Sequence, residues 1–301
     1  MTRDVALAEL VAQVERQLQA AGVAFGHGTL NAHDEAAWLA LHALGLPLDT
    51  VIDAYPRAIA PDQQARVQDL LRARIAARKP LAYLTGQAWL QGVPFYADER
   101  AIVPRSLIAE LIASGGIDPW LSDQTRRVLD LCTGNGSLAC LAALAWPEVQ
   151  VTGSDISADA LEVARINIER HGLPERVRLV RGDGLAACPG PWDLILCNPP
   201  YVNAASMAAL PPEYRAEPAL ALAGGADGMD FIRALLRDLR QPRQTPYLSP
   251  QGVLVLEIGH ERAHFDAAFP GLPVNALPTS AGEDQVLLIT AQALAFQGNA
   301  E

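Results

Sequence analysis

The sequence lacks the features of an exported or membrane-spanning protein. Among its 301 residues, apolar runs are interrupted well before the length that crosses a bilayer. Residues 1–10 include Arg3, Asp4 and Glu9 and contain no apolar signal-peptide core. The absence of a membrane span and of a signal-peptide core predicts a cytoplasmic protein with no membrane partner. The chain also has no fixed-period repeat and no low-complexity tract.

Cysteine is scarce as well. The chain has four cysteines, and none of them form a CxxC pair: Cys132, Cys140, Cys188 and Cys197. Two of them, Cys132 and Cys197, end apolar segments. We therefore expect reduced thiols, as in a cytoplasmic protein, and no disulfide framework.

Positive charge is in deficit, with 23 Lys and Arg against 34 Asp and Glu and a net charge of -11. This balance argues against a protein that grips duplex DNA through its phosphates, so we expect no direct DNA binding. The acidic charge would suit a basic protein partner, or it could simply keep the protein soluble. Half of the residues are hydrophobic and 19% are charged, which is typical of a globular protein with a sizeable core.

The first third of the chain has helical periodicity. Apolar residues recur at helical spacing from Leu7 to Leu18, and Gly22 follows as a stop. A second helix is expected over residues 35–45, and a third begins at Pro61, because proline suits the first helical position. The third helix ends in basic residues whose charge complements the helix dipole, so we assign no ligand to them: Arg72, Arg74, Arg78 and Lys79.

The rest of the chain changes pattern twice. Turn residues Gly92 and Pro94, among alternating aromatic and β-branched residues, predict a hairpin that connects two domains. From Arg126, apolar strands alternate with helices, which is typical of a mostly parallel sheet covered on both faces. The expected strands are residues 126–132, 149–155, 177–183, 192–200, 252–259 and 285–291. The predicted division is a helical domain (1–82), a connecting hairpin (83–108) and an α/β domain (109–301).

Polar residues mark the ends of consecutive predicted strands. Asp130 lies at the end of the first strand, before a glycine turn, and Asp155, Asp183 and Asn198 end the next three. Ligands of open α/β sheets bind at the carboxyl ends of strands, so this series predicts a ligand across that edge. If that ligand contains adenine, Asp183 would lie near the edge of the adenine ring, and Gly184 would leave room for the ring. The alternative is that Asp183 and Gly184 form a plain turn.

The glycine turn is a weaker signal. Gly134, Gly136 and Ala139 fit the G-x-G-x-x-A dinucleotide fingerprint, and Asp155 follows about twenty residues later, where an acid binds ribose hydroxyls. This pairing fits NAD and S-adenosylmethionine equally well. Asp155 could instead cap the next helix.

The stretch from Asn198 to Tyr201 favours one of these ligands. Pro199 and Pro200 have no N–H, so they leave carbonyl groups without neighbouring donors, and the Asn198 side chain offers one more acceptor. Such a site can hold an NH₂ group by both hydrogens, while Tyr201 lies flat against a planar amide or base. An N-methyltransferase would use this arrangement and a hydride-transfer enzyme would not. A structural turn is the alternative.

These motifs together resemble the S-adenosylmethionine-dependent N-methyltransferases. Three further segments resemble the HemK-like protein-(glutamine-N5) methyltransferases: residues 82–106, 213–222 and 224–233. The resemblance covers nearly the whole chain. It implies a Rossmann-like domain with a mostly parallel seven-stranded sheet, the last strand antiparallel, and an N-terminal helical domain that recognises the substrate.

The methyltransferase family that the chain resembles has two branches. One methylates the Gly-Gly-Gln of peptide release factors, and its members usually carry Ile-Pro-Arg-Pro-Glu-Thr-Glu after the hairpin. Here Ser106 replaces the second proline and Leu107 the acid, and residues 25–36 are similar to the branch that methylates the third large-subunit ribosomal protein. We therefore expect a basic ribosomal protein as substrate. The alternatives are a release factor, an NAD-dependent oxidoreductase, and a non-enzymatic assembly factor that binds no cofactor.

The resemblance also implies roles for the marked residues. Those expected to bind S-adenosylmethionine are Asp130, Thr133, Gly134, Asn135, Gly136, Asp155, Asp183, Gly184 and Asn198. Those expected to bind the amide substrate are Asn198, Pro199, Pro200 and Tyr201, with Asn198, Pro199 and Tyr201 as the catalytic group. Asn135 stands where Ser or Thr is commoner, but it can still donate a hydrogen bond. Glu257, at a later strand end, is expected to support the pocket.

One motif points to different chemistry. His260, Glu261 and His264 spell H-E-x-x-H, the zinc metalloprotease pattern. They directly follow a predicted strand end, and similar strings occur in the methyltransferase family without zinc. We therefore predict no metal.

Overall fold

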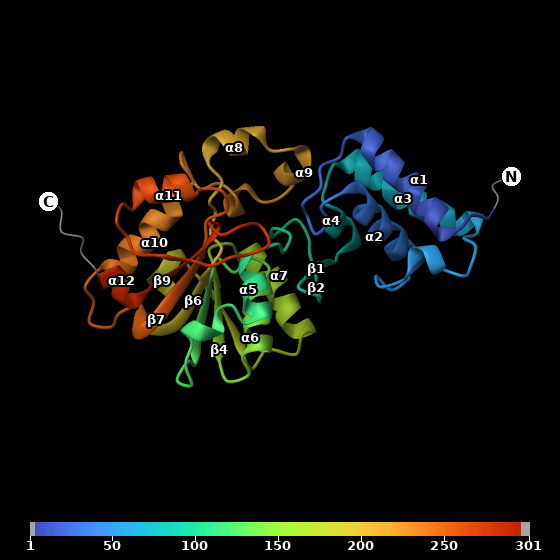
Figure 1. Ribbon diagram of the computed structural model, residues 1–301. Coiled ribbons are helices and arrows are strands. Elements are labelled where there is room, and N and C mark those ends of the chain that lie inside the picture. The colour runs from blue at the N-terminus through green and yellow to red at the C-terminus, as the bar shows by residue number, and fades with distance from the viewer. Residues whose placement is uncertain (1–3, 296–301) are drawn as a thin grey trace.

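The N-terminal part of the molecule is a bundle of helices (Figure 1). The structure, a computed structural model, describes residues 4–295. The first helices are α1 (Leu7–Ala21), α2 (Ala32–Leu44), α3 (Pro61–Ala77) and α4 (Leu81–Thr85), with a 3-10 turn over Ile52–Ala54. Gly22 ends α1 in the left-handed conformation, as predicted. The second helix begins three residues earlier than predicted, because Asn31 caps it through the backbone N–H of Asp34.

The predicted hairpin is confirmed. It pairs β1 (Ala88–Leu90) with β2 (Val93–Phe95) in antiparallel register. Gln91 and Gly92 form the turn, both with positive φ. Ala88 and Ala97 pack into the core of the helical bundle, and the predicted boundary at residue 82 falls inside α4. The division of the chain into domains stays a prediction.

The main sheet has seven strands in the described part of the chain, in the order β5-β4-β3-β6-β7-β9-β8. Its strands are β3 (Arg127–Leu131), β4 (Gln150–Asp155), β5 (Val177–Arg181), β6 (Trp192–Cys197), β7 (Leu248–Glu257), β8 (Asn275–Ala276) and β9 (Val286–Thr290). The β9 strand runs antiparallel to β7 and β8, and the other pairings are parallel. The mostly parallel seven-stranded sheet is therefore confirmed. The β8 strand lay outside the strands predicted from apolar runs because it has only two residues, both exposed.

Helices cover both faces of the sheet. One face packs against α5 (Ile108–Ser114), α6 (Ser137–Ala145) and α7 (Ala158–Arg170), and the other against α10 (Asp230–Arg240), α11 (Arg262–Ala268) and α12 (Ala291–Ala295). Alternate residues of each strand enter the two cores: Val128 packs with the first group and Leu129 with the second. All four cysteines are free thiols. Within residues 4–295, none of the helices combines the length and apolar character that a membrane span requires.

The connection between β6 and α10 leaves the sheet and reaches the helical bundle. This β6–α10 segment, residues 198–229, contains α8 (Ala204–Ala209), α9 (Pro212–Arg215) and a 3-10 turn over Ala219–Ala221. Figure 1 shows α9 between the sheet and the N-terminal helices. The segment that begins with Asn-Pro-Pro-Tyr therefore links the two halves of the molecule.

Candidate active site

A cavity of about 170 Å³ lies at the carboxyl ends of β3, β4 and β6. Its lining includes six of the predicted site residues: Gly134, Asp155, Asp183, Gly184, Asn198 and Pro200. Six other predicted site residues are outside the lining: Asp130, Thr133, Asn135, Gly136, Pro199 and Tyr201. The roles predicted for all twelve stay predictions.

The glycine loop allows neighbouring parts of the chain to approach each other closely. Gly134 and Gly136 both have left-handed backbone conformations, with φ of 55° and 77°. A Cβ on Gly136 would lie 3.0 Å from the Ala164 Cβ and 3.1 Å from its Cα, so glycine allows the start of α6 to pack on α7. The Gly134 N–H donates to Asp155 Oδ2 at 2.9 Å, which ties the loop to the end of β4.

Asp130 lies beneath the loop and is buried. Its Oδ2 accepts hydrogen bonds from the Thr133 hydroxyl and from the Ala139 N–H. Burial raises the pKa of Asp130 to about 7, although these two bonds oppose the shift. In the described part of the chain its Oδ1 has no hydrogen-bond partner. Asp130 and Thr133 thus hold the loop in shape from below.

Asp155 faces the cavity from the end of β4. Its Oδ1 accepts from the Ser157 N–H and its Oδ2 from the Gly134 N–H, both at 2.9 Å. Burial raises the pKa of Asp155, and these backbone bonds partly offset the rise. The cap of α7 is Ser157, whose hydroxyl accepts from the Ala160 N–H, so Asp155 is not needed as the helix cap. A carboxylate has about four lone-pair sites, which leaves Asp155 with capacity for a ligand.

Asn135 is turned into the protein. Its side-chain oxygen accepts from the Ser137 N–H at 3.0 Å, and its side-chain nitrogen donates to the Ile102 carbonyl at 3.3 Å. The residue is 3% exposed. The side-chain nitrogen thus fixes the loop to the chain that follows the hairpin, and the side-chain oxygen supports the start of α6.

The Asn-Pro-Pro-Tyr stretch forms one wall of the cavity. Asn198 and Pro200 line it, and the Asn198 side chain makes no hydrogen bond to residues 4–295. Pro199 is buried behind them. The Tyr201 ring packs against Gly259, where a Cβ would come within 2.5 Å of it. The one free polar side chain of the stretch is therefore Asn198, at the cavity wall.

Glu257 holds Tyr201 in place. Its Oε1 accepts from the Tyr201 hydroxyl at 3.1 Å, and its Oε2 accepts from the Ser106 hydroxyl at 2.6 Å and the Leu107 N–H at 2.9 Å. Burial raises the pKa of Glu257, and the bonds from Ser106 and Tyr201 oppose the rise. Ser106, which the sequence marked only as a difference between branches, is thus part of the support for Tyr201.

The end of the β6–α10 segment contributes residues that the sequence did not identify. Pro218, Leu220 and Ala221 line the cavity. They follow Glu217, whose buried carboxylate accepts two bonds from Arg105, at 2.6 and 2.7 Å. Burial opposes ionisation, but Arg105 holds the pKa of Glu217 at about 2. Glu217 therefore fastens this wall to the chain beyond the hairpin.

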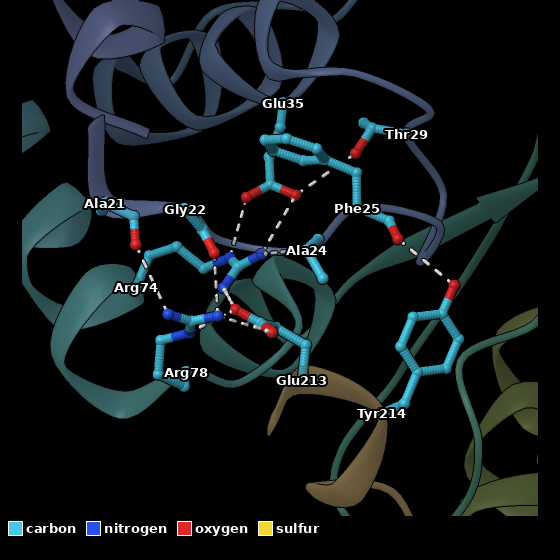
Figure 2. A network of polar contacts seen from close by, with 10 residues as sticks. All are labelled: Ala21, Gly22, Ala24, Phe25, Thr29, Glu35, Arg74, Arg78, Glu213 and Tyr214. Atoms are coloured by element: carbon cyan, nitrogen blue, oxygen red, sulfur yellow. Dashed lines mark hydrogen bonds and ion pairs between the residues drawn. The ribbon is translucent and has the colours of Figure 1, made fainter. Parts of the chain in front are cut away.

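The middle of the segment, at α9, is fastened to the helical bundle (Figure 2). Arg74, which is 0% exposed, donates to Glu35 Oε1 at 2.8 Å and to Glu213 Oε1 at 3.2 Å. Arg78 also donates to Glu213 Oε1, at 2.6 Å, and Tyr214 to the Phe25 carbonyl, at 3.2 Å. The basic end of α3 was predicted to complement its helix dipole and to bind no ligand. Two of its arginines also form a buried ion cluster with α9, which the sequence did not predict.

The H-E-x-x-H string has other partners. Glu261 precedes α11, accepts from the Asn203 side chain at 2.6 Å and pairs with His264 at 2.5 Å. His260 is exposed. Over the described residues, no group of three or more His, Cys, Asp or Glu side chains is placed to hold a metal ion.

Comparisons with known proteins agree with this architecture. Residues 117–210 match the model of the methyltransferase small domain, and residues 9–86 match the PrmC N-terminal domain. The chain is 53% identical to a ribosomal protein uL3 glutamine methyltransferase of Bordetella pertussis, over 96% of each chain. It is 49% identical to that of Burkholderia pseudomallei, over 95% of this chain and 94% of the relative. Its fold is similar to the hMettl16 catalytic domain crystallised with MAT2A 3'UTR hairpin 1, with a TM-score of 0.52 at 13% identity over 78% of this chain and 83% of that one.

Proposed function

Because the chain belongs to the family of ribosomal protein uL3 glutamine methyltransferases, we propose that it methylates the side-chain amide nitrogen of a glutamine in that ribosomal protein. It is an S-adenosylmethionine-dependent methyltransferase. The structural observation that carries the proposal is the free Asn198 side chain, followed by two prolines, at the wall of the cavity. We place the activity in the cytoplasm, with no direct DNA binding.

The residues of the cavity fit the methyl donor. Gly134 and Gly184 border open space, since a Cβ on either would meet no other described atom within 4 Å. Asp155 retains acceptor capacity for ribose hydroxyls, and Asp183 and Gly184 lie on the same lining for the base. Ile156 and Leu220 add apolar surface. When bound, S-adenosylmethionine supplies an electrophilic methyl group on a sulfonium.

The chain's own residues would prepare the amide. An amide nitrogen is a poor nucleophile because its lone pair is delocalised into the carbonyl. The Asn198 side chain and the Pro199 carbonyl would accept hydrogen bonds from both N–H groups of the substrate glutamine. These bonds would increase the negative charge on the amide nitrogen and fix the direction of its lone pair. Tyr201, held by Glu257 and Gly259, would keep the amide plane in position. The proton can leave after transfer, when the nitrogen is acidic, so no dedicated base is required.

The test of this function offers purified enzyme two substrates with labelled S-adenosylmethionine. We expect label on ribosomal protein uL3, either free or in an early particle, and none on the mature subunit. Label on a release factor and none on uL3 would overturn the substrate assignment. Methylation of a glutamine amide would still be the reaction. The relatives do not favour that alternative.

Asp155→Ala should weaken S-adenosylmethionine binding by about 1–3 kcal/mol, because the carboxylate forms charge-assisted bonds to ribose. Calorimetry with the folded variant measures the effect. Asp155→Asn is the matched control for the loop, because it keeps an acceptor for the Gly134 N–H. Unchanged affinity in the alanine variant would contradict the role of Asp155.

The charge of the enzyme should speed its encounter with a basic substrate. With a net charge of -11, the chain should attract a ribosomal protein through the solvent. We expect kcat/KM for the protein to fall as salt rises past physiological ionic strength, where the Debye length drops below about 8 Å. Steady-state kinetics over a salt series tests this. An equal fall with a short neutral glutamine peptide would show that salt acts on catalysis and not on encounter.

A further inference from the structure

The cavity that Asn198 lines has one cationic side chain among its described lining residues. That side chain is Arg100, and the acids of the lining are Asp155 and Asp183. Arg100 follows the hairpin and belongs to none of the motifs that marked the site. Its side chain is 39% exposed, so part of it can reach a ligand. The cavity therefore offers a ligand one positive charge, at a residue that has no assigned role.

The chain beside Arg100 is fixed to the rest of the site. Ala101 packs with Ala160 of α7, and its carbonyl accepts from the Tyr83 hydroxyl at 2.6 Å. The Ile102 carbonyl accepts a hydrogen bond from the glycine loop at 3.3 Å. These contacts hold the backbone that carries Arg100 against both α7 and the loop.

Asp98 holds the guanidinium of Arg100 by one edge. The Asp98 Oδ2 accepts from Arg100 Nη2 at 2.6 Å, and both carboxylate oxygens accept from Nε at 3.0 Å. The Tyr96 hydroxyl donates to the same Oδ2 at 2.9 Å, which fixes the carboxylate in turn. Arg100 Nη1 makes no hydrogen bond to the described residues. A guanidinium has five N–H donors, so the edge formed by Nη1 and Nη2 stays open for a second carboxylate.

The charges of the lining suit a zwitterion. S-adenosylmethionine carries one anionic group, its α-carboxylate, and two cationic groups, its ammonium and its sulfonium. Asp155 and Asp183 disfavour a ligand with several negative charges, such as a nucleoside diphosphate, whereas a single carboxylate can pair with Arg100. Arginine binds a carboxylate through two parallel N–H bonds, so the contact orients the ligand as well as attracting it.

We propose that Arg100 binds the α-carboxylate of S-adenosylmethionine through the open edge of its guanidinium. This contact fixes the amino-acid end of the donor, while Asp155 binds the ribose. It also makes the cavity selective for ligands that carry the carboxylate over ligands that carry adenosine alone. The inference rests on the proposed function, which places the methyl donor in this cavity.

The test measures binding by calorimetry with three ligands that share the adenosine. S-adenosylhomocysteine has the carboxylate, decarboxylated S-adenosylmethionine keeps only the ammonium and the sulfonium, and 5′-methylthioadenosine has none of these groups. We expect Arg100→Gln to lower the affinity for S-adenosylhomocysteine on the order of tenfold, the effect of losing a charge-assisted hydrogen bond at a partly exposed site. The affinities for the other two ligands should be unchanged, which also shows that the cavity of the variant is folded.

Two further variants complete the test. Arg100→Lys keeps the charge but not the two-pronged geometry, so it should recover part of the lost affinity. Arg165→Gln is the matched control, at an exposed ion-paired arginine of α7, and it should bind all three ligands as the wild type does.

Two results would overturn the inference. Unchanged affinity of Arg100→Gln for S-adenosylhomocysteine would show that the carboxylate has another partner. Equal losses for the three ligands would show that Arg100 shapes the cavity and does not read the carboxylate. Neither measurement requires methylation of the ribosomal protein, so the inference can fail while the proposed function stands. If Asp155→Ala also left the three affinities unchanged, the proposed site of the methyl donor would fail with it.

Discussion

Asn198→Ala should lower kcat for methylation by about 10²–10³, the loss typical of removing one positioned polar group from a transition state. Asn198 is at the wall of the cavity, and its side chain makes no hydrogen bond to the described residues. Its removal should therefore change stability little. The acceptor for one N–H of the substrate amide would be lost, and with it the negative charge on nitrogen that the reaction needs.

Single-turnover kinetics with saturating S-adenosylmethionine separates this effect from binding. We expect the affinity for S-adenosylmethionine to stay within a few fold of wild type, because Asp155 and the glycine loop are intact. Asn275→Ala, at an exposed position in β8, is the matched control and should react at the wild-type rate. A wild-type rate in Asn198→Ala would show that another group accepts the amide.

The strand ends were the most predictable part of the site. Asp155, Asp183 and Asn198 are far apart in the sequence, but the parallel strands that carry them end at one edge of the sheet. Alternating strands and helices predict that sheet from local patterns alone. The cavity that these residues share follows from topology, which is why residue type and position sufficed to find it.

The contacts that fasten the site could not be predicted in the same way. Arg74 and Glu213 are 139 residues apart, and Ser106 and Glu257 are 151 apart. No periodicity links such pairs, so the basic end of α3 was explained by its own helix dipole, which is a local effect. Asn135 shows a related limit. The sequence did not reveal that the turn directs its side chain to Ser137 and Ile102, and its role in binding the cofactor stays a prediction.

The contact between α9 and the helical bundle should have a large effect on stability. Glu213 is 0% exposed and accepts from Arg74 and Arg78. Glu213→Ala leaves Arg74, also 0% exposed, with Glu35 as its remaining acidic partner. Breaking a buried ion pair in this way typically costs about 3–5 kcal/mol, and we expect about 3 kcal/mol because Glu35 stays and the partly exposed Arg78 can return to water.

Urea unfolding measures this cost, and Asp266→Ala is the matched control. Asp266 pairs with Arg262 on the surface of α11, where the loss should stay below about 1 kcal/mol. Affinity for S-adenosylmethionine should fall as well, because α9 leads directly to Pro218 and Leu220 in the cavity wall. Equal stabilities of the two variants would show that the buried cluster contributes no more than a surface pair.

The dependence of folding stability on pH gives a further test of the Glu213→Ala variant. Against the effect of burial, Arg78 and Arg74 lower the pKa of Glu213 below its ordinary value of 4.5. A carboxyl whose pKa is lower in the folded state stabilises the protein above the unfolded-state pKa, and this stabilisation is lost as pH falls through the folded-state pKa. The stability difference between wild type and Glu213→Ala should therefore be full at neutral pH and shrink progressively below about pH 4.5, the ordinary carboxyl pKa. A difference that stays constant down to the acid limit of folding would mean that Glu213 acts through its packing and not through its charge.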